Sequence, residues 1–224
     1  MKFAIIVALQ SEFDLVKNIF ENCEEVSENN LHFVKGNVND NEVILAKSGI
    51  GKVNAAVLLT ELLHIFHPDY VVNTGVAGGI DGILKVGDVV VSEKCCYHDV
   101  WCGEGSWGQV QGLPLYFEGD KVLLQKLKTI SEKNMHFGLI CTGDQFITQN
   151  SVLHKIKENF PTALAVDMES AAMAQVCYLR NVPFVAVRVI SDTPFAEKEN
   201  AVQYFDFLNS APKLTFGILK KLIE

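Results

Sequence analysis

The chain has little positive charge. Lysine and arginine together number 19 among 224 residues, Arg180 and Arg188 are the two arginines, and the formal net charge is -8. A nucleic-acid-binding protein needs a field of basic side chains to neutralise phosphates, and an acidic surface repels nucleic acid and anionic membranes alike. The composition therefore argues against a nucleic-acid or membrane partner and leaves a small molecule as the expected ligand.

The sequence also lacks a long hydrophobic segment and a convincing export signal. Lys2 and the apolar residues after it imitate a short signal peptide, but no small-x-small cleavage site follows, and Glu12 and Asp14 come at once. Nothing approaches the length of a transmembrane helix. We interpret the start of the chain as a first buried strand.

Paired cysteine motifs are absent as well. The 6 cysteines include no C-x-x-C pair and stand at Cys23, Cys95, Cys96, Cys102, Cys141 and Cys177. Scattered cysteines without an export signal are typical of buried, reduced thiols, so we expect a cytoplasmic protein. The spacing around His98 fits no usual zinc site, and neighbours along a strand point to opposite faces. We therefore expect core thiols and no metal.

Short apolar runs alternate with longer helical patterns along the whole chain. The apolar, β-branched runs predict strands at 2–9, 31–36, 42–47, 69–75, 87–97, 136–142, 163–167 and 183–190. The helical patterns predict helices at 11–22, 52–66, 120–133, 151–158, 168–180 and 199–222. Runs such as YVVNTG and PFVAVRVIS are apolar on both faces, as strands covered on both sides are. This alternation predicts one layered α/β domain over residues 1–224, with a mostly parallel or mixed sheet.

Polar residues gather where the predicted strands end, which is where ligands bind in sheets of this kind. Glu12 follows the first strand, Asp192 closes PFVAVRVISD, and Glu169 follows another buried strand. Each also has an ordinary explanation, because helix starts favour acids and turns favour Asp. The glycine-rich stretches NTGVAGGI and SGIGK match neither a Walker loop nor GxGxxG, and tight turns explain them.

Arg188 and Phe146 carry more information. Arg188 stands inside the apolar run VAVRVIS, where an unpaired charge is costly, so it needs a carboxylate partner or an anionic ligand. Phe146 is either a core aromatic or a platform for a flat base, and Met168 is ordinary core filling. The residues by themselves indicate an α/β enzyme with an acid/base pair and leave its substrate open.

Eight segments together resemble the methylthioadenosine/S-adenosylhomocysteine nucleosidases of the purine nucleoside phosphorylase superfamily. They are ALQSEFD at 8–14, KSGIGKVNAA at 47–56, NTGVAGG at 73–79, KVGDVVVS at 85–92, YHD at 97–99, TGDQFI at 142–147, NFPTALAVDMESAA at 159–172 and NVPFVAVRVISD at 181–192. The match runs nearly end to end in the same order. It implies a three-layer α/β/α sandwich around a central twisted mixed sheet, a homodimer, and no metal or organic cofactor.

The resemblance also implies a role for each matched position. Glu12 would activate the attacking water, Asp192 would protonate N7 of the leaving adenine, and Arg188 would help order the water and Glu12. The other matched positions would bind substrate: Glu169 at the ribose hydroxyls, Met168 at the sugar, Phe146 and Ile147 at the base, Ser191 beside Asp192, and Leu9, Ile50 and Tyr204 around the 5′ substituent.

This assignment agrees with the chemistry of a C–N glycosidic bond. Cleavage builds positive charge on the sugar and negative charge on the base, so one carboxyl group protonates the leaving base while another deprotonates water. Related phosphorylases hold phosphate with arginines, and the corresponding stretches here, VVNTG and ALQSE, contain none. We therefore expect hydrolysis of adenosine-type nucleosides, with release of adenine, in the salvage of methylthioadenosine or S-adenosylhomocysteine. Three alternatives stay open: a phosphate-dependent purine nucleoside phosphorylase, a hydrolase of another purine nucleoside, and a non-catalytic nucleoside-binding protein.

Three features depart from the family pattern. Val76 stands where Ser is usual, which removes a hydroxyl from beside the expected water, and Asp167 stands where Glu is commoner. The segment 100–117, with Trp101 and Trp107, differs from the usual versions of a region that shapes the 5′ pocket in the family. The sequence therefore leaves the preferred 5′ substituent open.

Overall fold

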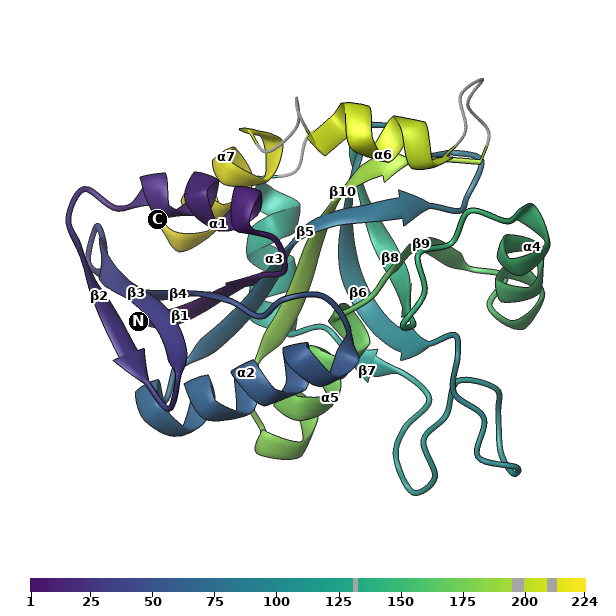
Figure 1. Ribbon diagram of the computed structural model, residues 1–224, viewed down its shortest axis with the longest axis horizontal. Helices are drawn as coiled ribbons and strands as arrows, with labels where there is room; N and C mark the ends of the chain where they lie inside the picture. Colours follow the sequence, from purple (N-terminus) through teal and green to yellow (C-terminus); the bar gives the residue numbers. More distant parts are fainter. Residues whose placement is uncertain (131–132, 195–199, 209–212) are drawn as a thin grey trace.

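The computed structural model describes residues 1–130, 133–194, 200–208 and 213–224. Figure 1 shows a sheet with helices on both sides. Its elements, in chain order, are β1 (Lys2–Val7), α1 (Gln10–Val16), the 3₁₀ turn η1 (Lys17–Ile19), β2 (Cys23–Glu28), β3 (Leu31–Val38), β4 (Asn41–Lys47), α2 (Lys52–Phe66), β5 (Tyr70–Gly79), β6 (Val89–Tyr97), β7 (Phe117–Glu118), α3 (Lys121–Thr129), β8 (Met135–Thr142), α4 (Asn150–Asn159), β9 (Ala163–Asp167), α5 (Ser170–Arg180), β10 (Phe184–Asp192), α6 (Asn200–Leu208) and α7 (Lys213–Ile223).

The sheet is mixed and partly closes on itself. Its strand order is β10-β6-β8-β9-β5-β1-β4-β3-β2, with β7 against β6. β1 runs parallel to β4 and β5, whereas β3 runs antiparallel to β2 and β4. Because β10 also pairs with β5, the strands β10, β6, β8, β9 and β5 form a closed ring, from which β1, β4, β3 and β2 extend.

Helices cover the two faces of the sheet in separate layers. α2 and α5 pack on one face through Leu58, Leu62 and Met173. α1, α3 and α7 pack on the other face through Phe13, Leu127 and Leu219, and Figure 1 shows α1 and α7 on the side opposite α2 and α5. The predicted three-layer α/β/α arrangement around a mixed sheet is confirmed. In addition, α4 packs against β6, β8 and β9.

The single helix predicted at 199–222 is wrong. The structure has α6 and α7 in its place, and Figure 1 draws them as two separate helices. Residues 209–212 of this prediction lie outside the described residues, as do 131–132 of the helix predicted at 120–133. In the sequence, Pro212 stands between the two helical patterns, and a proline inside a helical pattern is typical of a helix break.

One other predicted helix needs correction, and two strands were missed. The helix predicted at 11–22 ends at Val16 and continues only as η1. β2, which was not predicted, is an edge strand whose residues are exposed apart from the half-buried Val26, so it shows no apolar alternation. β7, also not predicted, has only 2 residues and gives no periodicity to detect.

The cysteines follow the prediction in part. All are free thiols, but Cys23 and Cys102 are exposed, so the core holds only the other four. Cys95 and Cys96 lie in different hydrophobic clusters, as neighbours on one strand should. Among the described residues, no helix combines the length and the apolar character needed to cross a bilayer.

Candidate active site

A cavity that opens to solvent lies at the carboxyl ends of β1, β5, β9 and β10. The structure brings together all the residues that were predicted to act in catalysis or to bind substrate, since all of them line this cavity: Leu9, Glu12, Ile50, Val76, Phe146, Ile147, Met168, Glu169, Arg188, Ser191, Asp192 and Tyr204. The lining is completed by residues that were not singled out as site residues: Ala8, Ala77, Gly78, Gln145, Val166 and Asp167. The cavity therefore occupies the place where ligands bind in open α/β sheets.

Glu12 is held by backbone amides in the first turn of α1. Its Oε2 accepts hydrogen bonds from the amides of Ala8 at 3.1 Å and Leu9 at 2.9 Å, and its Oε1 accepts one from the amide of Val76 at 3.2 Å. Burial raises the pKa of this carboxyl group, although the amides and Arg188 oppose the shift. Glu12 is therefore a fixed, buried carboxyl group and not a surface acid at a helix start.

Gly75 lets Glu12 and Arg188 approach each other beside β5. A Cβ atom on Gly75 would stand 2.6 Å from Nη1 of Arg188 and 2.8 Å from Oε1 of Glu12, closer than a real Cβ contact. The stretch 73–79 is part of β5, so the tight turn that its glycines suggested is wrong. Its glycine opens space for two charged groups.

Arg188 is buried in β10 and is paired, as its apolar surroundings require. Its Nη2 lies 2.7 Å from Oδ2 of Asp167 and 3.5 Å from Oε2 of Glu169. The guanidinium also donates hydrogen bonds to Ser170 Oγ and Asn73 Oδ1. Burial lowers the pKa of Arg188, but the surrounding carboxyl groups outweigh burial and the net shift is upward. The sequence predicted either a carboxylate partner or an anionic ligand for Arg188, and the structure shows carboxylate partners, Asp167 at the shorter distance and Glu169 at the longer one.

The residues that hold Arg188 were missed as site residues. Asp167 accepts hydrogen bonds from the hydroxyls of Thr142 and Ser170. Asn73 donates from Nδ2 to the carbonyl of Ile6 at 3.0 Å, which turns its Oδ1 toward the guanidinium. A signal existed for Asn73, because an amide inside the apolar run YVVNTG needs a buried partner. Asp167 and Ser170 flank Met168 and Glu169, but neither is a polar residue enclosed by an apolar run, so the sequence gives no such signal for them.

Glu169 precedes α5 without capping it. Its side chain makes no cap hydrogen bond, so the capping explanation is wrong. Instead Oε1 accepts a hydrogen bond from the amide of Gly51, at 3.0 Å. Burial, aided by the negative charges of Asp167 and Glu12, raises the pKa of Glu169 to about 7. The cavity therefore contains a carboxyl group that changes charge near neutral pH.

Asp192 ends β10 and is 3% exposed. The hydroxyl of Ser191 lies 2.7 Å from its Oδ1 and 3.2 Å from the carbonyl oxygen of Ala77. Burial raises the pKa of Asp192, and the hydrogen bond from Ser191 opposes the shift less strongly. A carboxyl group with a raised pKa keeps its proton to higher pH, which a general acid needs.

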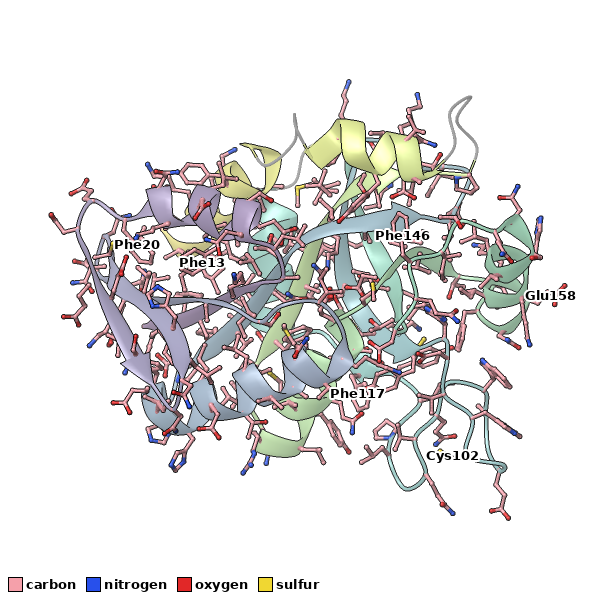
Figure 2. The ribbon with its side chains drawn as sticks, viewed as in Figure 1. Phe13, Phe20, Cys102, Phe117, Phe146 and Glu158 are labelled. Atoms are coloured by element: carbon pink, nitrogen blue, oxygen red, sulfur yellow. The ribbon has the colours of Figure 1, made fainter. Side chains whose placement is uncertain are left out.

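The other end of the cavity is apolar and open. The side chains of Phe146 and Ile50 are 49% and 50% exposed. The ring of Tyr204, on α6, lies 5.1 Å from the ring of Phe146, and Figure 2 shows Phe146 beneath α6. This exposure decides between the two interpretations of Phe146. It is not a core aromatic, and one face can receive a flat ligand.

The charges in the cavity are strongly unequal. Its carboxyl groups belong to Glu12, Asp167, Glu169 and Asp192, whereas Arg188 is the one cationic side chain among the described residues that line it. Over the described part of the chain, no three His, Cys, Asp or Glu side chains are grouped to hold a metal ion. The arrangement can move protons and bind hydroxyl groups, but it offers little to attract an anion.

The unusual segment 100–117 contributes nothing to the described lining of the cavity. Trp101 and Trp107 stack on each other with ring centroids 5.7 Å apart, and the indole of Trp107 donates to the carbonyl of His98 at 2.8 Å. Trp107 packs beside the cluster that holds α4. Within one chain, neither tryptophan contacts the cavity, and Trp101 is 50% exposed.

Known proteins resemble this chain over its whole length. A family model described as the phosphorylase superfamily matches residues 2–224. A 5′-methylthioadenosine/S-adenosylhomocysteine nucleosidase of Geobacillus sp. is 41% identical over 230 residues, covering 100% of this chain and 98% of the relative. The nucleosidase of Lysinibacillus sphaericus is 39% identical over 229 residues, covering 100% and 99%. The structure of the Streptococcus pneumoniae nucleosidase with a transition-state inhibitor has a TM-score of 0.93 at 34% identity, covering 100% and 98%.

Proposed function

The chain belongs to the phosphorylase superfamily, and we propose that it hydrolyses the N-glycosidic bond of methylthioadenosine and S-adenosylhomocysteine, releasing adenine. Relatives of 39% and 41% identity over the full length are nucleosidases of this kind, and a similar structure holds a transition-state inhibitor. One observation of the molecule itself supports the proposal most: two buried carboxyl groups, Glu12 and Asp192, line the same cavity as an exposed aromatic ring.

In this proposal Asp192 is the general acid. The departing adenine gains negative charge as its bond to C1′ breaks, and the proton of Asp192 passes to N7 of the base. Its burial and raised pKa support this role, because the group must be protonated before the reaction. Ser191 holds Oδ1 in place and leaves Oδ2 for the base.

Glu12 is the general base that takes a proton from the attacking water. The three amides that bind Glu12 fix the direction of its carboxylate, and the nearby guanidinium of Arg188 favours the ionised form. Val76 offers an amide but no hydroxyl, so the water depends on Glu12 and Arg188 for its position. The hydroxyl group of water then adds to C1′ of the ribose, opposite the departing base.

The remaining lining residues bind the nucleoside. Glu169 accepts hydrogen bonds from the ribose hydroxyls, and Met168 lies against the sugar. Phe146 stacks on adenine, while the main chain at Ile147 contacts the edge of the base. The 5′ substituent lies at the open, apolar side of the cavity, among Leu9, Ile50 and Tyr204.

Water is a better nucleophile here than phosphate. Arg188 is already paired with Asp167, and the other charged groups in the described lining are carboxyl groups. A phosphate dianion would meet repulsion that a water molecule does not. The same charge pattern argues against a phosphorylase.

We further infer a cytoplasmic homodimer in which residues 1–224 act as one domain. Val53 and Val57 lie one turn apart on α2, and Ile50 lies just before this helix. The three are exposed at 73%, 54% and 50%, and a second copy would cover them. The free thiols suit a reducing compartment. The cavity draws its residues from the segment directly after β1, from several elements in between and from α6, which supports one functional unit.

The test is adenine release from methylthioadenosine, S-adenosylhomocysteine and adenosine, each with and without phosphate. We expect release without phosphate, and the ranking of substrates gives the preferred 5′ group. Release that strictly requires phosphate would show a phosphorylase instead. No release in either condition would leave another purine nucleoside or a binding protein as the function.

A further inference from the structure

The loop that carries Phe146 is fixed by charged residues outside the cavity. This loop, residues 143–149, joins β8 to α4. The amide of Asp144 donates to Oδ2 of Asp99 at 2.9 Å, and Oδ1 of Asp144 accepts from the amide of Lys52 at 2.8 Å. Asp144 thus joins the loop to the segment after β6 and to the first residue of α2.

The side chain of Lys52 closes this arrangement. Its Nζ lies 2.9 Å and 2.7 Å from the carboxylate oxygens of Asp99, and 3.8 Å from Oδ2 of Asp144. The same ammonium group lies 5.4 Å from the centre of the Tyr97 ring. We call Lys52, Asp99 and Asp144 the Lys52 cluster. None of these residues is among the described residues that line the cavity.

The backbone next to the cluster also holds Glu169. Gly51 has a φ of 96°, which favours glycine, and its amide donates to Oε1 of Glu169 at 3.0 Å. Two consecutive amides at the start of α2 therefore bind two different carboxylates. The amide of Gly51 binds Glu169 in the cavity, and the amide of Lys52 binds Asp144 in the Phe146 loop. A shift of this turn would move Phe146 and Glu169 together.

We propose that the Lys52 cluster positions the substrate-binding side of the cavity, by fixing the Phe146 loop to the start of α2. Its members are positioning residues, since they act through Phe146 and Glu169. The inference rests on the function proposed above, because it assigns base and ribose binding to those two residues. Neither Glu12 nor Asp192 depends on the cluster, so the proton-transfer groups keep their geometry without it.

This role differs from that of an ordinary surface ion pair, which contributes little to stability. The side chains of Lys52 and Asp99 are only 22% and 23% exposed. Two backbone amides also join the cluster, because the amide of Lys52 donates to Asp144 and the amide of Asp144 donates to Asp99. Loss of the charge should leave the fold intact and loosen the loop. The cost then appears in binding, because the nucleoside must order the loop when it binds.

The test compares Asp99→Asn and Lys52→Gln with the control Asp81→Asn. The control breaks the pair of Lys157 and Asp81, which are 2.8 Å apart and similarly buried at 28% and 27% exposed. KM and kcat for methylthioadenosine are measured without phosphate, together with the dissociation constant of adenine by calorimetry and the unfolding temperature. Lys52→Arg, which keeps the charge, serves as the conservative variant.

We expect Asp99→Asn and Lys52→Gln each to raise KM and the adenine dissociation constant about 5- to 20-fold, with kcat changed less than about twofold. Lys52→Arg should recover part of the loss, and Asp81→Asn should match the wild type. An unchanged KM in folded cluster variants of an active enzyme would overturn this inference alone. A wild-type protein that neither binds nor releases adenine would overturn the proposed function, and this inference with it.

Discussion

The two ends of the cavity are built in different ways. At the buried end, Glu12, Arg188 and Asp192 are each held by hydrogen bonds, and none is more than 8% exposed. At the open end, Phe146 and Ile50 are about half exposed, and their surroundings are apolar. A proton donor needs a dry, fixed position to keep a shifted pKa, whereas the nucleobase and the 5′ substituent of the substrate need an accessible apolar surface. Changes at the buried end should therefore lower kcat, and changes at the open end should raise KM.

The largest effect should come from Asp192→Asn. The amide cannot protonate N7, so we expect kcat to fall by roughly 10²–10⁴-fold or more while the nucleoside still binds. Single-turnover adenine release and equilibrium binding separate the two quantities. Retention of near wild-type kcat would remove the general-acid assignment.

The pH dependence of stability tests the electrostatics of Glu169, the buried carboxyl group on the substrate-binding side of the cavity. The folded pKa of Glu169, about 7, exceeds its ordinary value of 4.5, so the folded state binds more protons between these values. The free energy of unfolding should therefore fall as pH rises from about 4.5 to about 7, by up to about 3 kcal/mol from this group. Urea unfolding at several pH values should show a smaller fall for Glu169→Gln than for the wild type. Equal slopes would contradict the assigned pKa.

Gly75→Ala tests the contact between the two charged residues. The added methyl group would meet both Arg188 and Glu12, so we expect kcat to fall about 10- to 100-fold. The free energy of unfolding should also fall by about 1–3 kcal/mol, because the space is already filled. Gly82→Ala is the matched control, since nothing lies within 4 Å of a Cβ atom there. Equal activity of the two variants would show that the close approach has no catalytic value.

Phe146→Ala should have the smallest effect, and this effect should appear in KM and not in kcat. Loss of a stacking face costs about 1–3 kcal/mol per base, so we expect KM to rise about tenfold while kcat is largely kept. Phe146→Tyr keeps the aromatic face and should behave like the wild type. A fall in kcat of the size expected for Asp192→Asn would erase the distinction between the two ends.

Much of this molecule could be predicted from local patterns. The apolar runs at β1 and β10 located two strands whose ends carry Glu12 and Asp192, and the match of separated motifs located the cavity residues. Other features depend on contacts between distant segments. Asn73 and Ser170 meet at Arg188 although they are 97 positions apart in the sequence. Lys52 meets Asp99 and Asp144 beside the cavity, 47 and 92 positions away from it. Periodicity cannot reveal such contacts.

The errors have the same origin. β2 is an edge strand whose residues are exposed apart from the half-buried Val26, so no alternation marks it. The glycines of 73–79 suggested a turn, whereas Gly75 serves an extended strand that two charged side chains approach. In both cases tertiary structure, and not local propensity, determined the conformation.

The most direct test of the account is the source of the oxygen in the sugar product. Methylthioadenosine is turned over in water enriched in ¹⁸O, with phosphate present, and the products are analysed by mass spectrometry. Hydrolysis predicts free adenine and a methylthioribose that carries one ¹⁸O at C1. An unlabelled sugar 1-phosphate would contradict the account, because phosphate and not water would then have attacked the ribose.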